Sequence, residues 1–288
     1  MKLKENKLIR DIPWKFFALA FAVSWTLWGI AWIMARGNAV VHGDTATMLS
    51  SSSPVMLAFI VLGTFGPLSA AFIMTALESG RTGVRKLWKR GWDVKLGWKW
   101  FLVILLLFPM FRLISLLISG EGISLHRWQN PLQLLALLFF LYFLGGPFGE
   151  DYGWNGYALP RLLESWSRIS ASLILGLFWI AWHFPLFFIP GSPQAQISFI
   201  PWAISVMSLS FIFTWILEKT RGIIFGTILL HAMVNMSGDL IASGGGEPGF
   251  LSARMINTGL QIGTAVALGL YWTSRKKKTD TLRPALQS

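Results

Sequence analysis

Long apolar stretches, separated by short polar segments, recur along the whole chain. A helix that crosses a bilayer needs about 20 mainly apolar residues, and its backbone polar groups must be satisfied within the segment. The sequence therefore predicts an all-α fold, a polytopic transmembrane helical bundle with about eight spans. The expected spans are about 16–35, 54–77, 100–119, 131–148, 169–190, 200–217, 222–242 and 255–273.

The basic residues are distributed unevenly between the segments that join these spans. Eight spans place both ends of the chain on one side of the membrane, and 21 of the 25 Lys and Arg residues lie in segments of that side. Cytoplasmic segments of membrane proteins carry such an excess. The sequence therefore predicts cytoplasmic termini and a multi-pass protein of the cell membrane, here a bacterial plasma membrane. The basic segments are 1–15, 78–99, 149–168, 218–221 and 274–288.

The composition favours lipid over nucleic acid as the main partner. Only 13% of residues are charged and 54% are hydrophobic, too little charge for a soluble surface. The net charge of +12 would suit a nucleic-acid binder, but its position makes it a topology signal and a contact for anionic headgroups. Since Cys is absent, disulfides and thiolate catalysis are excluded. We expect a basic N-terminus at 1–15, one transmembrane domain at 16–273 and a basic tail at 274–288, with no indication of an oligomeric state.

Three short patterns place polar side chains among the apolar stretches, where ionisable groups are costly and often functional. They are Glu150-Asp151 with Asn155, then His183, then His231 with Asn235. Asn155 follows Asp151 by one helical turn and could donate a hydrogen bond to it. An acidic pair can also mark a helix N-terminus at the membrane surface, and a single His can serve an interhelical hydrogen bond. The occurrence of all three patterns together favours a functional site.

Arg112 is a further charge at membrane depth. It follows Pro109 in the third apolar stretch and could face a cavity or pair with Asp239 or Glu150. The interpretation that we favour from the sequence is a structural one, in which the guanidinium reaches the interface or faces the bundle.

The side chains of the three patterns can supply what hydrolysis of an amide requires. Water needs a base, the developing oxyanion needs donors, and the leaving amine needs a proton. A Glu, two His and an Asn can provide all of these. Glu150, His183 and His231 could instead hold a divalent metal such as zinc, although the chain has no HExxH motif. The cofactor is therefore unknown, and metal-dependent and glutamate-type hydrolysis both stay open.

The three patterns resemble the motifs of the CPBP intramembrane proteases, also called the Abi or CAAX-protease group. The family motifs are EExxxR, FxxxH and HxxxN, in this order on separate transmembrane helices. Here they read Glu150-Asp151-Tyr152-Gly153-Trp154-Asn155, Trp179 to His183, and His231 to Asn235. The resemblance is specific over about 145–240 and only topological elsewhere. It implies an intramembrane endopeptidase that acts on a peptide or prenylated-peptide substrate at the membrane.

The resemblance also implies a role for each matching residue. Glu150 would be the general base that activates water, and His183 would assist it. His231 and Asn235 would stabilise the oxyanion, with Asp151 and Asn155 in support. Some accounts of the family instead invoke a metal.

This sequence departs from the family motifs at three positions. Asp151 replaces a Glu, Trp179 replaces a Phe, and Asn155 replaces an Arg, with the loss of a charge and a bidentate donor. The two changes could compensate for each other, because the shorter acid Asp151 would pair with the shorter, neutral Asn155. We expect retained activity because all four proposed catalytic residues are present. The alternative is weakened or lost activity, as in a non-catalytic binding protein on the same fold, such as a bacteriocin-immunity factor or a scaffold. A transporter would show internal repeats, and we find none.

Overall fold

The computed structural model describes residues 12–36, 53–137, 139, 146–245 and 251–274. The long helices are α2 (Trp14–Ala35), α5 (Gly66–Arg90), α6 (Trp98–Ser119), α10 (Arg168–His183), α11 (Phe199–Lys219), α12 (Ile224–Leu240) and α13 (Ala253–Ser274). The shorter elements are α4 (Pro54–Gly63), β1 (Ile123–Ser124), η1 (His126–Gln129), α7 (Pro131–Leu137), α8 (Pro147–Gly153), η3 (Trp154–Ala158), α9 (Leu159–Ser165), η4 (Phe184–Phe188), η5 (Pro193–Gln196) and β2 (Ala242–Ser243).

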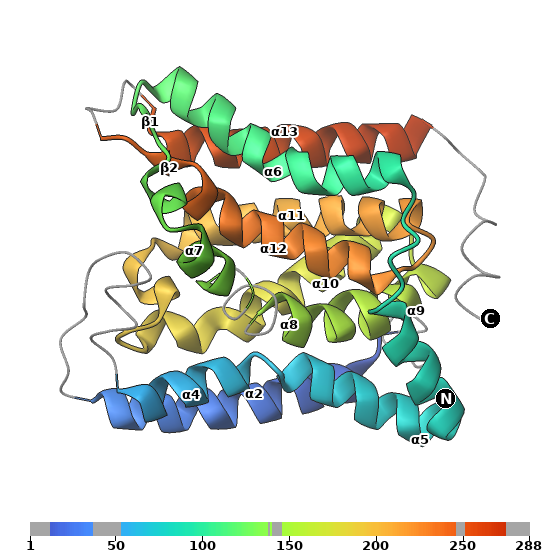
Figure 1. The fold of residues 1–288 in the computed structure, drawn as a ribbon. Helices are drawn as coiled ribbons and strands as arrows, with labels where there is room; N and C mark the ends of the chain where they lie inside the picture. Colours follow the sequence, from blue (N-terminus) through green and yellow to red (C-terminus); the bar gives the residue numbers. More distant parts are fainter. Residues whose placement is uncertain (1–11, 37–52, 138, 140–145, 246–250, 275–288) are drawn as a thin grey trace, which may run out of the picture.

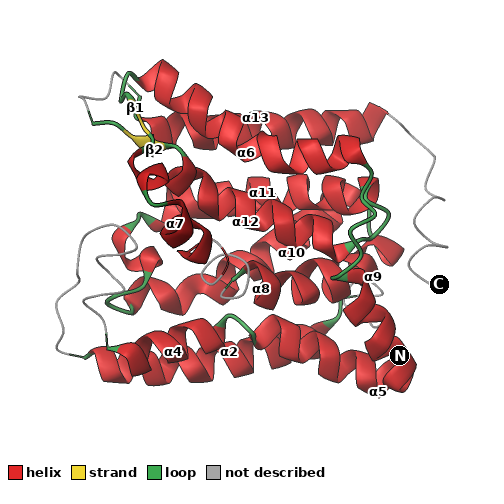
Figure 2. Cartoon of the chain, viewed as in Figure 1, coloured by secondary structure: helices red, strands yellow, loops and turns green. Residues whose placement is uncertain are grey.

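The long helices lie side by side in one bundle (Figure 1). The helices α6 and α13 form one side of the view, α2, α4 and α5 form the opposite side, and α8, α10, α11 and α12 lie between them. The strands β1 and β2 form one short antiparallel pair at one end of the bundle (Figure 2). The predicted all-α helical bundle is therefore confirmed.

Four helices in the described part of the chain are long and apolar enough to cross a membrane. They are α2, α6, α10 continued by η4, and α11, and the bent pair of α4 and α5 counts as a fifth span. The helix α12 is apolar but shorter. The count of eight spans and the cytoplasmic termini stay predictions. The predicted span 131–148 includes 138 and 140–145, and these lie outside the described residues, as do 1–11 and 275–288.

The segment 149–168, which we expected to join two spans at the cytoplasmic surface, is largely helical and buried. The elements α8, η3 and α9 follow one another without a break, and all residues from 147 to 160 are buried. The segment 149–160 is therefore not an exposed connection between spans, and the side of the membrane on which it lies stays a prediction. The polar and Gly residues of this segment suggested the membrane–water interface. They instead contact residues of other helices, and a hydropathy pattern does not report such contacts.

The break between α4 and α5 is fixed by side chains of α2. The two helices meet at 43°. Pro67 has no N–H to donate to the carbonyl of Gly63, and the Ser24 hydroxyl donates to that carbonyl at 2.7 Å. The Trp28 indole N–H donates to the Ile60 carbonyl at 2.9 Å. Because an unsatisfied carbonyl is costly in an apolar environment, these bonds hold α2 against the break.

The helix α8 packs against this break through two glycines one turn apart. A Cβ atom on Gly149 would lie 2.8 Å from the Thr64 carbonyl oxygen, and one on Gly153 would lie 2.4 Å from Cβ of Pro67. Small residues at this spacing let two helix backbones approach closely in membrane proteins. The contact sets the depth of α8 in the bundle, and with it the position of Glu150.

We expect Gly153→Ala to destabilise the protein. The added methyl group would overlap the Pro67 backbone as well as its side chain, and overpacking of this kind costs about 1–3 kcal/mol. Thermal unfolding in detergent measures the effect. Gly259→Ala on α13 is the matched control, because no atom lies within 4 Å of its added Cβ. Equal melting temperatures for the two variants would contradict the proposed packing of α8.

Candidate active site

A cavity of about 400 Å³ brings the four proposed catalytic residues together. Its lining includes Glu150 from α8, His183 from α10, and His231 and Asn235 from α12. The volume is within the range of small-molecule sites. Side chains that lie up to 85 positions apart in the sequence therefore share one cavity.

Glu150 is held by an indole of α10. Glu150 is only 5% exposed, and its Oε2 atom accepts a hydrogen bond from Trp179 Nε1 at 2.7 Å. The indole is a donor only, so it stabilises an ionised carboxylate in this apolar setting. This bond joins α8 to α10.

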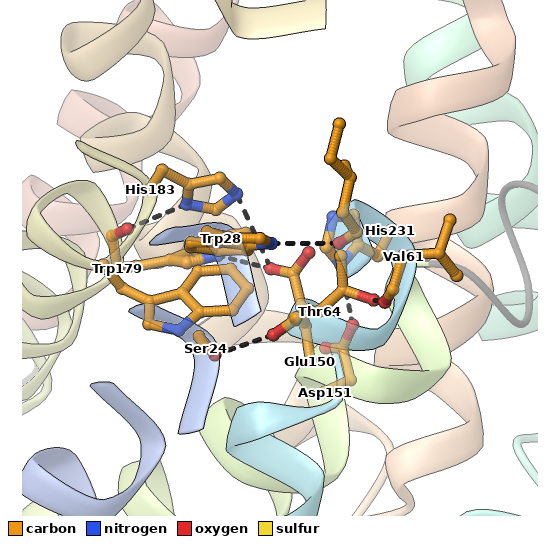
Figure 3. Close-up of polar contacts among 12 residues, drawn as sticks. Ser24, Trp28, Val61, Thr64, Glu150, Asp151, Trp179, His183 and His231 are labelled. Atoms are coloured by element: carbon orange, nitrogen blue, oxygen red, sulfur yellow. Dashed lines mark hydrogen bonds and ion pairs between the residues drawn. The ribbon is translucent and has the colours of Figure 1, made fainter. Parts of the chain in front are cut away.

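His183 lies at the C-terminal end of α10 and faces Glu150. Its Nδ1 atom is 2.9 Å from the Trp179 carbonyl oxygen. A carbonyl only accepts, so Nδ1 carries the proton and the neutral ring presents the lone pair of Nε2. This Nε2 atom lies 3.9 Å from Oε2 of Glu150, too far for a direct hydrogen bond. The two atoms instead have a separation at which one water molecule can contact both. Figure 3 marks this contact by a dashed line between His183 and Glu150.

Asp151 orients the second histidine. Its Oδ2 atom lies 2.8 Å from Nδ1 of His231, and its Oδ1 atom accepts a hydrogen bond from the Asn155 amide. The carboxylate is fully buried and therefore uses both oxygens. The predicted hydrogen bond between Asn155 and Asp151 is confirmed. Adjacent residues on α8 thus serve different parts of the site, with Glu150 beside His183 and Asp151 beside His231.

Asn235 and Arg112 also line the cavity. Glu150 and Asn235 both lie near Gly146. A Cβ atom built on this glycine would be 3.7 Å from Oε1 of Glu150 and 4.0 Å from Nδ2 of Asn235, so the two polar groups are on the same side of Gly146. Arg112 donates from Nε to the Ile241 carbonyl at 3.0 Å. Its guanidinium is therefore both anchored to the backbone and accessible from the cavity.

Trp179 is the residue of the site that sequence reasoning missed. It stands where the family motif has Phe, and the change from one aromatic residue to another looked minor. Its indole N–H contacts Glu150 and its carbonyl contacts His183, so it organises both. The donor capacity of Trp, four positions before His183, was the available signal.

The side chains of the site fit a metal ion only in part. No group of three or more His, Asp or Glu side chains in the described part of the chain is gathered closely enough to hold a metal. Of the candidates Glu150, His183 and His231, Glu150 and His183 approach one another to 3.9 Å. His231 is instead paired with Asp151.

Comparisons with known proteins identify the same part of the chain. Residues 131–237 match the family model described as type II CAAX prenyl endopeptidase Rce1-like. The chain is also 27% identical, over 272 residues, to CAAX prenyl protease 2 of the archaeon Methanococcus maripaludis. That alignment covers 90% of this chain and 93% of the relative.

The two matches confirm the resemblance that the motifs predict. The fold and the site define a multi-pass membrane protein whose class is the intramembrane endopeptidases. Within that class, the chain is similar to the CAAX prenyl proteases, and it is a hydrolase.

We expect Asp151→Asn to lower both stability and turnover. The amide has one acceptor oxygen where the carboxylate has two, so either His231 or Asn155 loses its acceptor. A buried donor without a partner costs about 1–3 kcal/mol. Unfolding in detergent and a cleavage assay measure the two effects. Glu164→Gln, the same chemical change on an exposed side chain, is the control, and an equal loss of stability in both variants would contradict the assigned role of Asp151.

Proposed function

We propose that this protein hydrolyses a peptide bond at the membrane by a glutamate-type mechanism, with Glu150 as the general base. One observation carries the proposal. The Glu150 carboxylate and Nε2 of His183 face one another at 3.9 Å, in the cavity that His231 and Asn235 also line. Two acceptors at this separation can both receive a hydrogen bond from one water molecule, which orients an oxygen lone pair toward a substrate carbonyl.

Glu150 accepts the proton as the water oxygen forms its bond with the carbonyl carbon. The same carboxyl group then protonates the leaving amine when the C–N bond breaks, so that the products are a carboxylic acid and an amine. The Trp179 indole supports this role because it holds the carboxylate in one orientation.

His231 and Asn235 stabilise the negative charge that develops on the carbonyl oxygen. Asp151 accepts from Nδ1 of His231 and favours a cationic ring, whose Nε2 then carries a proton toward the cavity. The Asn235 amide supplies a second donor. Asn155 takes the position of the motif Arg and satisfies Asp151 as a neutral donor, which supports retained activity.

The substrate that we propose is a prenylated peptide with a C-terminal CAAX sequence. The named relative is a CAAX prenyl protease, and the matched family is described as a CAAX prenyl endopeptidase. A peptide whose Cys carries an isoprenoid is held at the bilayer, where this helical bundle can receive it.

We expect Glu150→Gln and His183→Ala each to reduce cleavage of a prenylated CAAX peptide by about 100-fold or more, the usual contribution of a general base. The assay uses the full chain in liposomes, and mass spectrometry detects the products. Glu164→Gln should leave the rate unchanged. Activity that both variants retain would refute the proposed mechanism, and a protein that never cleaves would favour the non-catalytic binding function. Loss of activity in a chelator, restored by zinc, would favour the metal-dependent alternative.

Trp179→Phe should lower kcat by about tenfold, because a hydrogen bond to a charged group is lost while the aromatic packing stays. Trp182→Phe is the matched control on the same helix, since the buried Trp182 Nε1 has no hydrogen-bond partner among the described residues. Steady-state kinetics compare the two variants. An equal fall in kcat would mean that indole packing, rather than the bond to Glu150, explains the effect.

A further inference from the structure

The part of the cavity formed by α6 and α13 carries polar groups that the proposed mechanism does not use. We name it the α6–α13 wall, and it consists of Arg112, Arg254, Asn257 and Gln261. Arg112 comes from α6, and the other three residues follow one face of α13 at helical spacing. The wall belongs to the same cavity as Glu150 and His183.

The two arginines have no acidic partner in the described part of the chain. The ion pairs formed there are Glu78 with Arg161, Glu218 with Arg168, and the two His contacts of the site. Arg112 uses Nε on the Ile241 carbonyl, which leaves its terminal nitrogens for a ligand. The charged groups that influence Arg112 most are Glu121 and Arg254. Glu121 is itself bound to the backbone N–H of Ala253.

Gln261 adds an independent observation. Its side chain is only 4% exposed, yet it lines the cavity. The Ser205 hydroxyl donates to its Oε1 atom, so the amide N–H groups are the part of this side chain that can donate to a ligand. An amide donor held at the cavity by an otherwise buried side chain can bind an acceptor that arrives with a ligand.

The groups that Arg112, Arg254 and Gln261 offer to a ligand are therefore cationic or hydrogen-bond donors, and the Asn257 amide can donate as well as accept. Two guanidinium groups that line one cavity repel each other, and an anion between them relieves that repulsion. A carboxylate is the anion that suits guanidinium best, because its two oxygens match the fork of N–H groups.

We propose that the α6–α13 wall binds the C-terminal carboxylate of the peptide substrate. The inference rests on the proposed function. In a CAAX sequence three residues follow the prenylated Cys, so the bond after that Cys lies about 10 Å from the terminal carboxylate in an extended chain. The wall and Glu150 line the same cavity, so a free C-terminus at the wall would bring that bond into the cavity of the catalytic residues. The wall would thus measure the distance from the end of the chain and exclude internal sites.

The test compares two prenylated CAAX peptides that differ only at the C-terminus, one a free acid and the other an amide. For wild-type protein in liposomes we expect kcat/KM to favour the acid by about tenfold or more. Arg112→Gln and Arg254→Gln should each bring the ratio toward one. Arg254 is exposed, so its substitution should not impair folding. Arg36→Gln should keep both the rates and the ratio, because Arg36 lies outside the cavity and covers the Trp32 ring.

A binding experiment separates failure of this inference from failure of the proposed function. The Glu150→Gln variant is titrated with both peptides without turnover. Tighter binding of the acid, lost when Arg112→Gln or Arg254→Gln is added, supports the carboxylate site even if the wild-type protein cleaves neither peptide. Equal binding of acid and amide, or a preference that survives both substitutions, overturns the inference. A lipid phosphate that occupied the wall would make the acid and the amide bind equally.

Discussion

The contact between α8 and the break that joins α4 to α5 supports every other feature of the site. Pro67 interrupts the backbone hydrogen bonds, and Ser24 and Trp28 of α2 satisfy the carbonyls that become available. Gly149 and Gly153 then allow α8 to lie directly on the break. Because α8 carries adjacent acidic residues, its depth and rotation decide which histidine each of them meets.

The polar groups of the site follow one rule of construction. Each His uses Nδ1 on a fixed acceptor, the Trp179 carbonyl for His183 and the Asp151 carboxylate for His231. The other ring nitrogen is thereby available for chemistry. In a setting of low dielectric these bonds are strong, and an unmade bond is costly, so the network holds a few side chains rigidly within an otherwise apolar bundle. Trp179 is central because it contributes from both its backbone and its side chain.

Much of the fold and of the site could be predicted from the sequence. Apolar stretches of about 20 residues have no alternative to helix in a bilayer, and the helices α2, α6 and α11 lie close to the predicted bounds. The cost of charge in lipid made Glu150, His183 and His231 conspicuous. The segment 149–160 was predicted as a connection between spans, but it is helical and buried because its acidic residues are satisfied by side chains distant in sequence.

The sequence by itself determined the helical membrane fold and the kinds of residue available for catalysis, because both depend on local composition and on the cost of exposing polar groups to lipid. Only the tertiary structure decided the partners: the indole of Trp179 on Glu150, Asp151 on His231, and two arginines beside Gln261 in one cavity. Hydrogen bonds of this kind join different helices. They depend on how the helices rotate and on how closely they pack, and neither property is encoded within a single span.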